Sequence, residues 1–301
     1  MKKVVVMGAT GRTGNRVATA LLGSGVEVHA LGREPARMAA LWQAGARVLT
    51  GDPRSGAFLK EAFKGADAVY TLLPYKFEEP NYRATQAALG EAIIEGLRGS
   101  AVKNVVFVSS LGADQPGGTG MIDTMREQEH RLRALAASTP GLNVLCLRAG
   151  SFFENFYAAL PVIKHQGVNA DAVLPDLPIP MIATRDIADA AVAALKALDW
   201  KGFVVRELLG QRDISYAEAT RIIGTRLGLP RLQYVQLSYG DFEQALLQGG
   251  FAADVAPLYV EITRAINEGR IKTQEGRHAG NTTTTTLEEF AEELARAYGQ
   301  A

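Results

Sequence analysis

The sequence predicts an α/β fold in which a doubly wound parallel sheet is followed by a smaller α+β lobe at the carboxy terminus. Over the first two thirds of the 301 residues, short apolar segments alternate with helical ones, as in βαβ units. The short segments are apolar throughout, which is typical of parallel strands covered on both faces. A hydrophobic content of 47% lets a chain of this length bury such a core.

Six strands are expected in chain order, each a short run of β-branched and other apolar residues. They are Val4–Met7, Val26–Leu31, Arg47–Thr50, Ala68–Leu73, Asn104–Val108 and Val144–Leu147. Helices of crossover length separate them. These are Asn15–Leu22, Pro35–Ala44, Ser55–Phe63, Asn81–Leu97 and Thr124–Ala137. Strands joined by helices in this way predict a sheet built from the amino-terminal half of the chain.

Beyond Arg148 the alternation weakens, and three prolines make Leu174–Ile182 an extended segment. A helix is expected from Thr184 to Leu198. Two further helices, Ala219–Leu227 and Leu287–Ala297, are each preceded by a capping-box spacing. The caps are Ser215 with Glu218 and Thr286 with Glu289.

These patterns predict two parts of the chain without a linker that would separate independent domains. We expect the sheet domain at residues 1–150 and a second lobe at 151–301, with about 184–210 returning to the sheet. A cleft between the two parts would then be the place for a ligand.

A glycine-rich loop follows the first predicted strand and precedes the first predicted helix. Glycine allows backbone angles and close approaches that a Cβ would block. The amides of the turn and the positive end of the helix dipole together form a site for a diphosphate. Because the loop has the required strand–loop–helix context, it predicts a bound dinucleotide. The binding residues are Gly8, Thr10, Gly11, Arg12, Thr13 and Gly14.

The end of the second predicted strand distinguishes the two nicotinamide dinucleotides. NAD sites have an acidic residue about 20 residues beyond the loop, which bonds the ribose hydroxyls. Here Arg33 takes that place, and a guanidinium binds a 2′-phosphate through paired hydrogen bonds. Arg37 and Arg12 can assist, whereas Glu34 leaves open a role on the ribose. The sequence therefore favours NADP(H) over NAD(H).

Three other strand ends carry candidate residues, because ligands of open α/β sheets bind at the carboxyl ends of strands. The candidates are Gly51 and Asp52 after the third strand, Leu72, Leu73 and Pro74 after the fourth, and Ser109 and Ser110 after the fifth. We expect Asp52 near the adenine and Ser109 at the cofactor. Ser110 is a candidate for orienting a reacting carbonyl, and capping of the strand end is the alternative role for both serines.

Over nearly its whole length the chain resembles the NmrA-like branch of the atypical short-chain dehydrogenases. The most specific motif is Leu147-Arg148-Ala149-Gly150-Ser151-Phe152-Phe153-Glu154-Asn155-Phe156, and the glycine loop, Val108–Ala113, Ile179–Ala188 and Thr284–Phe290 also look family-like. The resemblance implies a Rossmann domain with a small carboxy-terminal lobe, and it places Asn155 at the cofactor. It implies one of two functions: an NADPH-dependent reductase of quinones, azo compounds or related acceptors, or a redox sensor without turnover that acts on a protein partner.

The sequence departs from the wider superfamily at its proton donor. Short-chain dehydrogenases typically carry Tyr-x-x-x-Lys on the helix after the fifth strand, where the tyrosine donates a proton and the lysine lowers its pKa. Alignment on Glu129 puts Met121 and Met125 at these two positions. Methionine can do neither, so ordinary carbonyl reduction is not expected. Quinones and azo compounds accept a hydride without a strong acid, so they fit the sequence better.

Aromatic residues are the candidates for the rest of the acceptor site. We expect the substrate pocket to be walled by Phe152, Phe153, Phe156 and Met125. Tyr75 and Tyr157 are candidates for a weak acid or a stacking surface, with ordinary packing as the alternative. Our first hypothesis is an oxidoreductase that reduces a small conjugated acceptor, and our second is the non-catalytic redox sensor.

Composition excludes several other classes of function. With 32 basic and 32 acidic side chains the net charge is zero, which gives no sign of a nucleic-acid-binding face. No cluster of residues has metal-ligand spacing, and the single cysteine, Cys146, lies in a predicted strand. No segment approaches the length of a membrane span, so we expect a cytoplasmic protein. The expected partner is a small-molecule acceptor, and a protein partner or a homodimer is left open.

Overall fold

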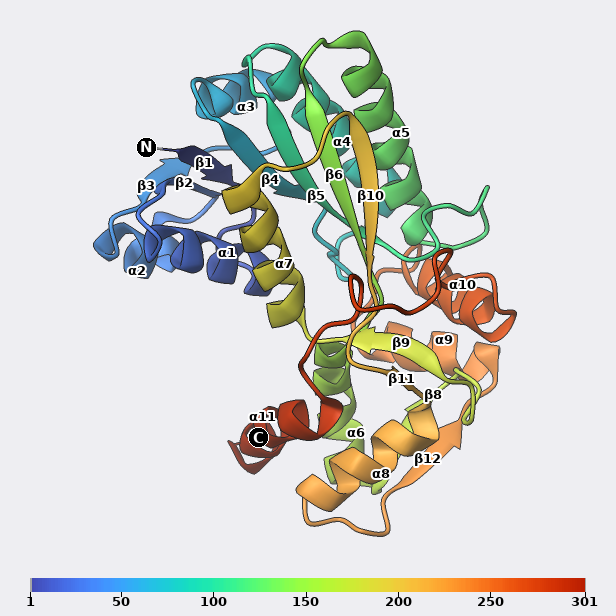
Figure 1. Cartoon of the computed structure of the whole chain (residues 1–301). Coiled ribbons are helices and arrows are strands. Elements are labelled where there is room, and N and C mark those ends of the chain that lie inside the picture. Colours follow the sequence, from blue (N-terminus) through green and yellow to red (C-terminus); the bar gives the residue numbers. More distant parts are fainter. Residues whose placement is uncertain (1, 301) are drawn as a thin grey trace.

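The computed structural model describes residues 2–300 and contains a seven-stranded, wholly parallel sheet, seen in the upper part of Figure 1. The spatial order is β10-β6-β5-β4-β1-β2-β3. The strands are β1 (Lys3–Val6), β2 (Glu27–Gly32), β3 (Arg47–Thr50), β4 (Ala68–Leu72), β5 (Asn104–Ser110), β6 (Asn143–Ala149) and β10 (Phe203–Leu208). This confirms the predicted doubly wound α/β fold, whose winding reverses between β1 and β4.

Helices cover both faces of the sheet, and each face has its own hydrophobic core. One face carries α1 (Arg12–Leu22), α2 (Ala39–Gln43) and α7 (Thr184–Ala197); the other carries α3 (Gly56–Phe63), α4 (Tyr82–Arg98) and α5 (Ile122–Ser138). Within β1, Val4 and Val6 pack into the first core and Val5 into the second. Alternate side chains of a strand point to opposite faces, which explains why these strands are apolar throughout.

The predicted helix Pro35–Ala44 is the main difference from the expected elements of the sheet domain. It is a 3₁₀ turn, Pro35–Met38, followed by the short helix α2. The Arg37 amide donates to the Glu34 carbonyl at 3.2 Å, the i to i+3 spacing of a 3₁₀ turn. Pro35 begins the turn, where its missing N–H costs no hydrogen bond.

The second lobe lies below the sheet in Figure 1 and has a separate core. Its strands are β7 (Ser151–Phe152), β9 (Ile179–Ile182) and β11 (Asp213–Ile214) in one small sheet, and β8 (Val168–Asp171) with β12 (Gln233–Gln236) in another. Its helices are α6 (Leu160–Gln166), α8 (Tyr216–Arg226), α9 (Tyr239–Gln248), α10 (Ala256–Asn267) and α11 (Leu287–Gln300), after a 3₁₀ segment at Phe153–Ala159. The sequence predicted α8 and α11, but α6, α9 and α10 carried no cap signal that we recognised. Within residues 2–300, no helix combines the length and the apolarity that spanning a bilayer requires.

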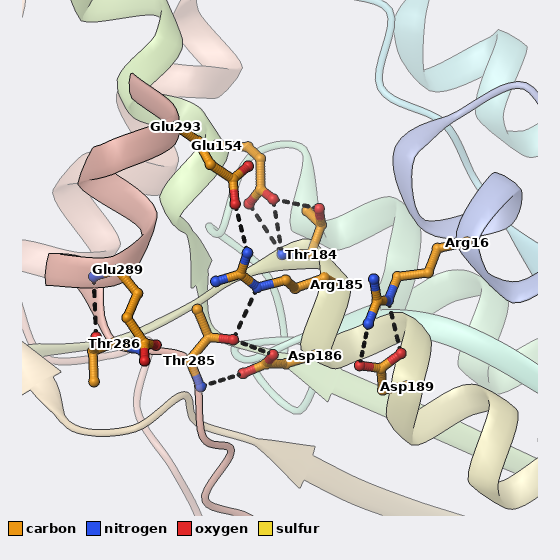
Figure 2. Close-up of polar contacts among 10 residues, drawn as sticks. All are labelled: Arg16, Glu154, Thr184, Arg185, Asp186, Asp189, Thr285, Thr286, Glu289 and Glu293. Atoms are coloured by element: carbon orange, nitrogen blue, oxygen red, sulfur yellow. Dashed lines mark hydrogen bonds and ion pairs between the residues drawn. The ribbon is translucent and has the colours of Figure 1, made fainter. Parts of the chain in front are cut away.

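The start of α7 joins the two parts through polar contacts, as Figure 2 shows. Glu154 accepts hydrogen bonds from the Thr184 amide at 3.0 and 3.1 Å, so it caps the helix. Asp186 accepts from the Thr285 amide at 3.1 Å and from its hydroxyl at 2.6 Å. The segment that leads into α11 is therefore fixed against α7.

Both predicted capping residues accept the expected hydrogen bond, but only one capping box is complete. Thr286 Oγ1 accepts from the Glu289 amide at 3.1 Å, and Glu289 accepts from the Thr286 amide at 3.0 Å. Ser215 likewise accepts from the Glu218 amide at 3.2 Å, whereas the Glu218 carboxylate forms an ion pair with Arg212 at 2.9 Å. The Glu218 carboxylate therefore pairs with Arg212 instead of accepting the reciprocal hydrogen bond from the Ser215 amide.

Candidate functional site

A groove of about 700 Å³ lies at the carboxyl ends of β1, β2, β3 and β4, where the winding reverses. Open α/β sheets bind their ligands at this place. Nine of the sequence-predicted cofactor residues line the groove. They are Gly8, Thr10, Gly11, Thr13, Arg33, Gly51, Asp52, Leu72 and Pro74. The tertiary structure thus brings together residues from four separate loops.

The glycine loop has the backbone that a diphosphate site needs. Gly8 has a φ of +64°, and its carbonyl accepts from the Gly11 amide at 2.9 Å. A Cβ on Gly14 would lie 2.3 Å from the Gly8 oxygen, so only glycine allows this helix to approach the strand. Gly11 caps α1 without a side-chain hydrogen bond, and the first turn has no acidic residue. The amides at this helix end are therefore available to an anion, which fits a dinucleotide diphosphate.

Positive side chains gather at the groove where the second and third strands end. Arg33 is exposed there and forms no ion pair within the described residues 2–300. Arg54 also lines the groove and forms an ion pair with Asp52 at 3.0 Å. Hydrogen bonding to Arg54 lowers the pKa of the Asp52 carboxyl. Asp52 is thus held as a carboxylate by a neighbouring guanidinium.

Arg37 lies outside the groove. Its guanidinium is 3.7 Å from the Glu34 carboxylate, and neither side chain is among the described residues that line the groove. The 3₁₀ turn directs this pair away from the strand end. The structure therefore brings Arg33 to the groove without Arg37.

Sequence reasoning missed three charged residues of the groove: Arg54, Lys76 and Glu79. Arg54 follows Asp52 by two residues, and Lys76 follows Pro74 by two residues. The signal was therefore present in the loops after the third and fourth strands, just beyond the residues that we selected. Lys76 and Glu79 form an ion pair with each other.

Arg12 and Tyr157 contact each other rather than the groove. The Arg12 guanidinium carbon lies 4.5 Å from the centre of the Tyr157 ring. Tyr157 packs edge-on against Phe290 at 5.8 Å. Neither residue is among the described lining residues of the groove or of the adjoining cavity. This contact joins the amino terminus of α1 to the second lobe.

A second cavity of about 260 Å³ continues from the groove, since Thr13, Leu72 and Pro74 line both. Six further predicted residues line this cavity together with Leu73. They are Tyr75, Ser109, Ser110, Met125, Phe152 and Asn155. Most of its wall is apolar and comes from both lobes. The groove and the cavity together form a path from the glycine loop to the cleft between the lobes.

The hydroxyl protons of the two serines are already donated within the protein. Ser109 donates to Glu129 at 2.6 Å, and Glu129 forms a buried ion pair with Arg148 at 2.6 Å. Ser110 donates to the carbonyl of Leu111 at 2.9 Å. In this arrangement both serine oxygens can accept a hydrogen bond, but neither offers a free proton to a ligand.

Met121 and Met125 line the cavity beside the serines, and both are buried. The side chains at the two positions where the wider superfamily has tyrosine and lysine therefore do face the cavity, but they are apolar thioethers. Tyr75 stacks on Phe77 at 5.9 Å and on Tyr82 at 6.3 Å. Burial raises the pKa of Tyr75, which makes it a poorer acid than a free phenol.

The three phenylalanines of the most specific motif have different surroundings. Phe152 lines the cavity. Phe153 is fully buried against Phe290, with ring centres 5.6 Å apart, and Phe156 packs against Tyr216 at 5.6 Å. The 3₁₀ segment that begins at Phe153 turns the latter two rings into the core of the second lobe.

Asp171 is an acidic residue of the cavity that sequence reasoning missed. It ends β8, and the Val173 amide donates to its Oδ1 at 3.1 Å. Burial raises the pKa of Asp171 to about 6. No motif surrounds this residue in the sequence, so only the fold reveals its position.

Comparison with known proteins identifies the family. A sequence model described as NAD(P)H-binding matches residues 8–198. The chain belongs to this NAD(P)H-binding family. It is 28% identical over 258 residues to the (4-alkanoyl-5-oxo-2,5-dihydrofuran-3-yl)methyl phosphate reductase of Streptomyces griseus, covering 86% of this chain and 85% of that protein. It is also 28% identical to the NmrA-like family domain-containing oxidoreductase FrzB of a Cladobotryum species, covering 52% of this chain and 48% of that protein.

Solved structures of related proteins have the same fold as this chain. The NADPH-dependent quinone oxidoreductase QOR2 of Escherichia coli, in complex with NADPH, is 25% identical with a TM-score of 0.81; the match covers 97% of this chain and 99% of that one. The triphenylmethane reductase of a Citrobacter species, in complex with NADP(H), is 18% identical with a TM-score of 0.78 and the same coverage. Together with the family match, these findings confirm the predicted NmrA-like resemblance and the Rossmann fold.

Residues 2–300 contain no cluster of three or more histidine, cysteine, aspartate or glutamate side chains arranged to hold a metal ion.

Proposed function

We propose that the protein is an NADPH-dependent oxidoreductase that reduces a small conjugated acceptor, a quinone or an azo compound. One observation carries this proposal: the dinucleotide groove opens into a largely apolar cavity through Thr13, Leu72 and Pro74. A flat apolar acceptor in that cavity would lie against the inner end of the groove. The family match and the quinone-reducing relative of known structure support the same reaction class.

The preference for NADPH rests on Arg33. Its guanidinium lines the groove where a ribose hydroxyl or a 2′-phosphate is bound in this fold. The nearest acidic residue in the sequence, Glu34, lies next to Arg37 rather than in the groove. A carboxylate would select NAD by bonding the ribose hydroxyls, whereas a free guanidinium favours the extra phosphate.

The chemistry divides between the cofactor and the chain. When bound, the dinucleotide supplies the hydride. The glycine loop holds its diphosphate, and the apolar wall with Met121, Met125 and Phe152 excludes water from the acceptor. Because the hydroxyl protons of Ser109 and Ser110 are engaged, we infer an acceptor whose reduced form takes its proton from solvent after it leaves the cavity.

The acceptor that we propose differs from that of the Streptomyces relative in one respect. The name of that relative specifies a phosphate ester as its substrate. Among the described residues, no lysine or arginine lines the cavity. A phosphate would have no cationic partner there, so we infer an acceptor without this group.

The second candidate function is a redox sensor that binds NADP(H) and acts on a protein partner. It is favoured by the methionines at positions 121 and 125, because these positions lack the proton-transfer pair of the wider superfamily. A sensor should bind NADPH and NADP⁺ with different affinities and should retain a partner. An enzyme needs neither property.

The test is oxidation of NADPH by the purified protein with a panel of quinones and azo compounds. We expect turnover with some members and a lower KM for NADPH than for NADH. Background rates with every acceptor would contradict the enzymatic proposal, and a partner retained in only one redox state of the cofactor would then support the sensor.

A further inference from the structure

The cavity next to the dinucleotide groove has one charged side chain among its described lining residues. Its described lining residues are apolar or neutral, except for Asp171. The positive side chains Arg33, Arg54 and Lys76 all line the groove instead. Arg54 and Lys76 are paired there with Asp52 and Glu79, which leaves Arg33 as the unpaired charge among the described residues of the groove. A ligand that extends beyond the groove therefore passes from one positive group to one negative group.

The backbone around Asp171 is firmly held. The Val173 amide donates to its carboxylate at 3.1 Å. The Tyr234 hydroxyl lies 3.1 Å from the Asp171 carbonyl and 2.6 Å from the Val173 carbonyl, and Asn267 donates to the Ala172 carbonyl at 2.9 Å. The carboxylate is thus part of a rigid turn that links β8, β12 and α10.

No cation compensates the charge of Asp171 within the described residues 2–300. It forms no ion pair with lysine, arginine or histidine, and its surroundings hold three tyrosines, Tyr216 of α8, Tyr234 of β12 and Tyr259 of α10. Burial, and then the charge of Asp171, raise the pKa of each phenol, so all three remain neutral. Tyr216 and Tyr259 line the cavity with Asp171. A carboxylate flanked by aromatic rings forms a site that attracts a cation.

We propose that Asp171 is the specificity-determining residue of the acceptor cavity, and that it selects conjugated acceptors with a cationic group over anionic ones. The inference rests on the proposed function, because it assigns the substrate class of that same site. A cationic group near Asp171 provides the missing counter-charge in a water-poor cavity. An anionic group there would face a like charge at low dielectric.

The experiment uses three naphthoquinones that carry a trimethylammoniomethyl, a methyl or a sulfonate group at the same ring position. Their charges do not change with pH. Titration calorimetry measures the Kd of each for the full chain saturated with NADP⁺, and NADPH oxidation is followed in parallel. We expect the cationic compound to bind about 10 to 100 times more tightly than the anionic one at slightly alkaline pH.

Two variants and one pH series test the role of the carboxylate. Asp171→Asn keeps the shape of the side chain and should bring the ratio of the two Kd values close to one. Asp176→Asn removes the same charge from the exposed part of the same loop and should leave the ratio unchanged. In the wild-type chain the ratio should also fall as the pH drops below about 6, where Asp171 becomes protonated.

The outcomes separate this inference from the proposed function. Equal binding of the two charged quinones, or a ratio that survives in Asp171→Asn and at low pH, would overturn the inference even if NADPH is oxidised. Charge-selective binding that depends on Asp171, without turnover of any quinone, would support the inference and contradict the enzymatic proposal. If Asp171→Asn does not fold, the pH series of the wild-type chain decides the question.

Discussion

The groove and the cavity are adjoining parts of one cleft, but the chain builds them differently. The groove is formed by short, continuous segments at neighbouring strand ends, and its glycine loop presents backbone amides. The cavity is formed by side chains that lie as far apart in the sequence as Thr13 and Ile271. Among the described lining residues, the groove carries one unpaired positive charge, that of Arg33, whereas Asp171 makes the cavity negative.

This contrast teaches where specificity comes from in such a protein. Backbone amides on a glycine loop bind a diphosphate whatever the other loops contain, so the groove serves a whole family. The cavity depends on which side chains the second lobe presents, so it can differ between relatives with the same fold. Substitutions in the two regions should therefore have separable effects.

The largest effect is expected at Gly14. In Gly14→Ala the new Cβ would lie 2.3 Å from the Gly8 oxygen, so the loop must move and NADPH binding should be lost in titration calorimetry. Gly23→Ala is the control, because its Cβ would have no neighbour closer than 3.6 Å. Normal NADPH affinity in Gly14→Ala would show that the loop does not hold the cofactor.

Substitutions at Phe152 and Phe153 should distinguish a ring that lines the cavity from a ring that packs in the core. Truncation of fully buried Phe153 to alanine should lower the free energy of unfolding by about 3–5 kcal/mol in urea denaturation. Phe152→Ala should cost clearly less stability and should raise the acceptor KM, because this ring lines the cavity. Equal losses of stability in the two variants would contradict this division.

Arg33 and Arg37 test the charge of the groove. Arg33→Ala should weaken NADPH binding by about 10 to 100 times and leave NADH binding almost unchanged, because only NADPH has the 2′-phosphate. Arg37→Ala should change neither Kd, since Arg37 lies next to Glu34 outside the groove. A matching loss of NADH affinity in Arg33→Ala would instead indicate general damage to the groove.

A pH-dependent effect on stability is expected at Asp171. Its pKa rises from 3.8 to about 6 on folding, so the folded chain binds more protons than the unfolded chain between these values. The contribution of Asp171 to the free energy of unfolding therefore falls as pH rises from about 4 to 6. Asp171→Asn should stabilise the protein by about 3 kcal/mol at slightly alkaline pH and have little effect below about pH 4. Thermal unfolding at both pH values measures this difference, and an equal effect at both would contradict the raised pKa.

Much of the groove was predictable because its signals are local. The glycine loop, Arg33 and the strand ends each follow an apolar strand, and parallel strands bring their carboxyl ends to one edge of the sheet. The prediction was less complete in the loops themselves. Arg54 lies two residues beyond Asp52 and Lys76 one residue beyond Tyr75, and Arg37 was placed in a regular helix that proved to be a 3₁₀ turn.

The sequence by itself determined the sheet, the glycine loop and the family, because these depend on apolar periodicity and on the backbone freedom of glycine at fixed positions. Only the tertiary structure decided that Phe152 faces the cavity while Phe153 and Phe156 do not, and that Asp171 stands among tyrosines from three different elements. The physical reason is that the direction of a side chain and the polarity around it are set by packing between distant segments, which leaves no local pattern in the chain.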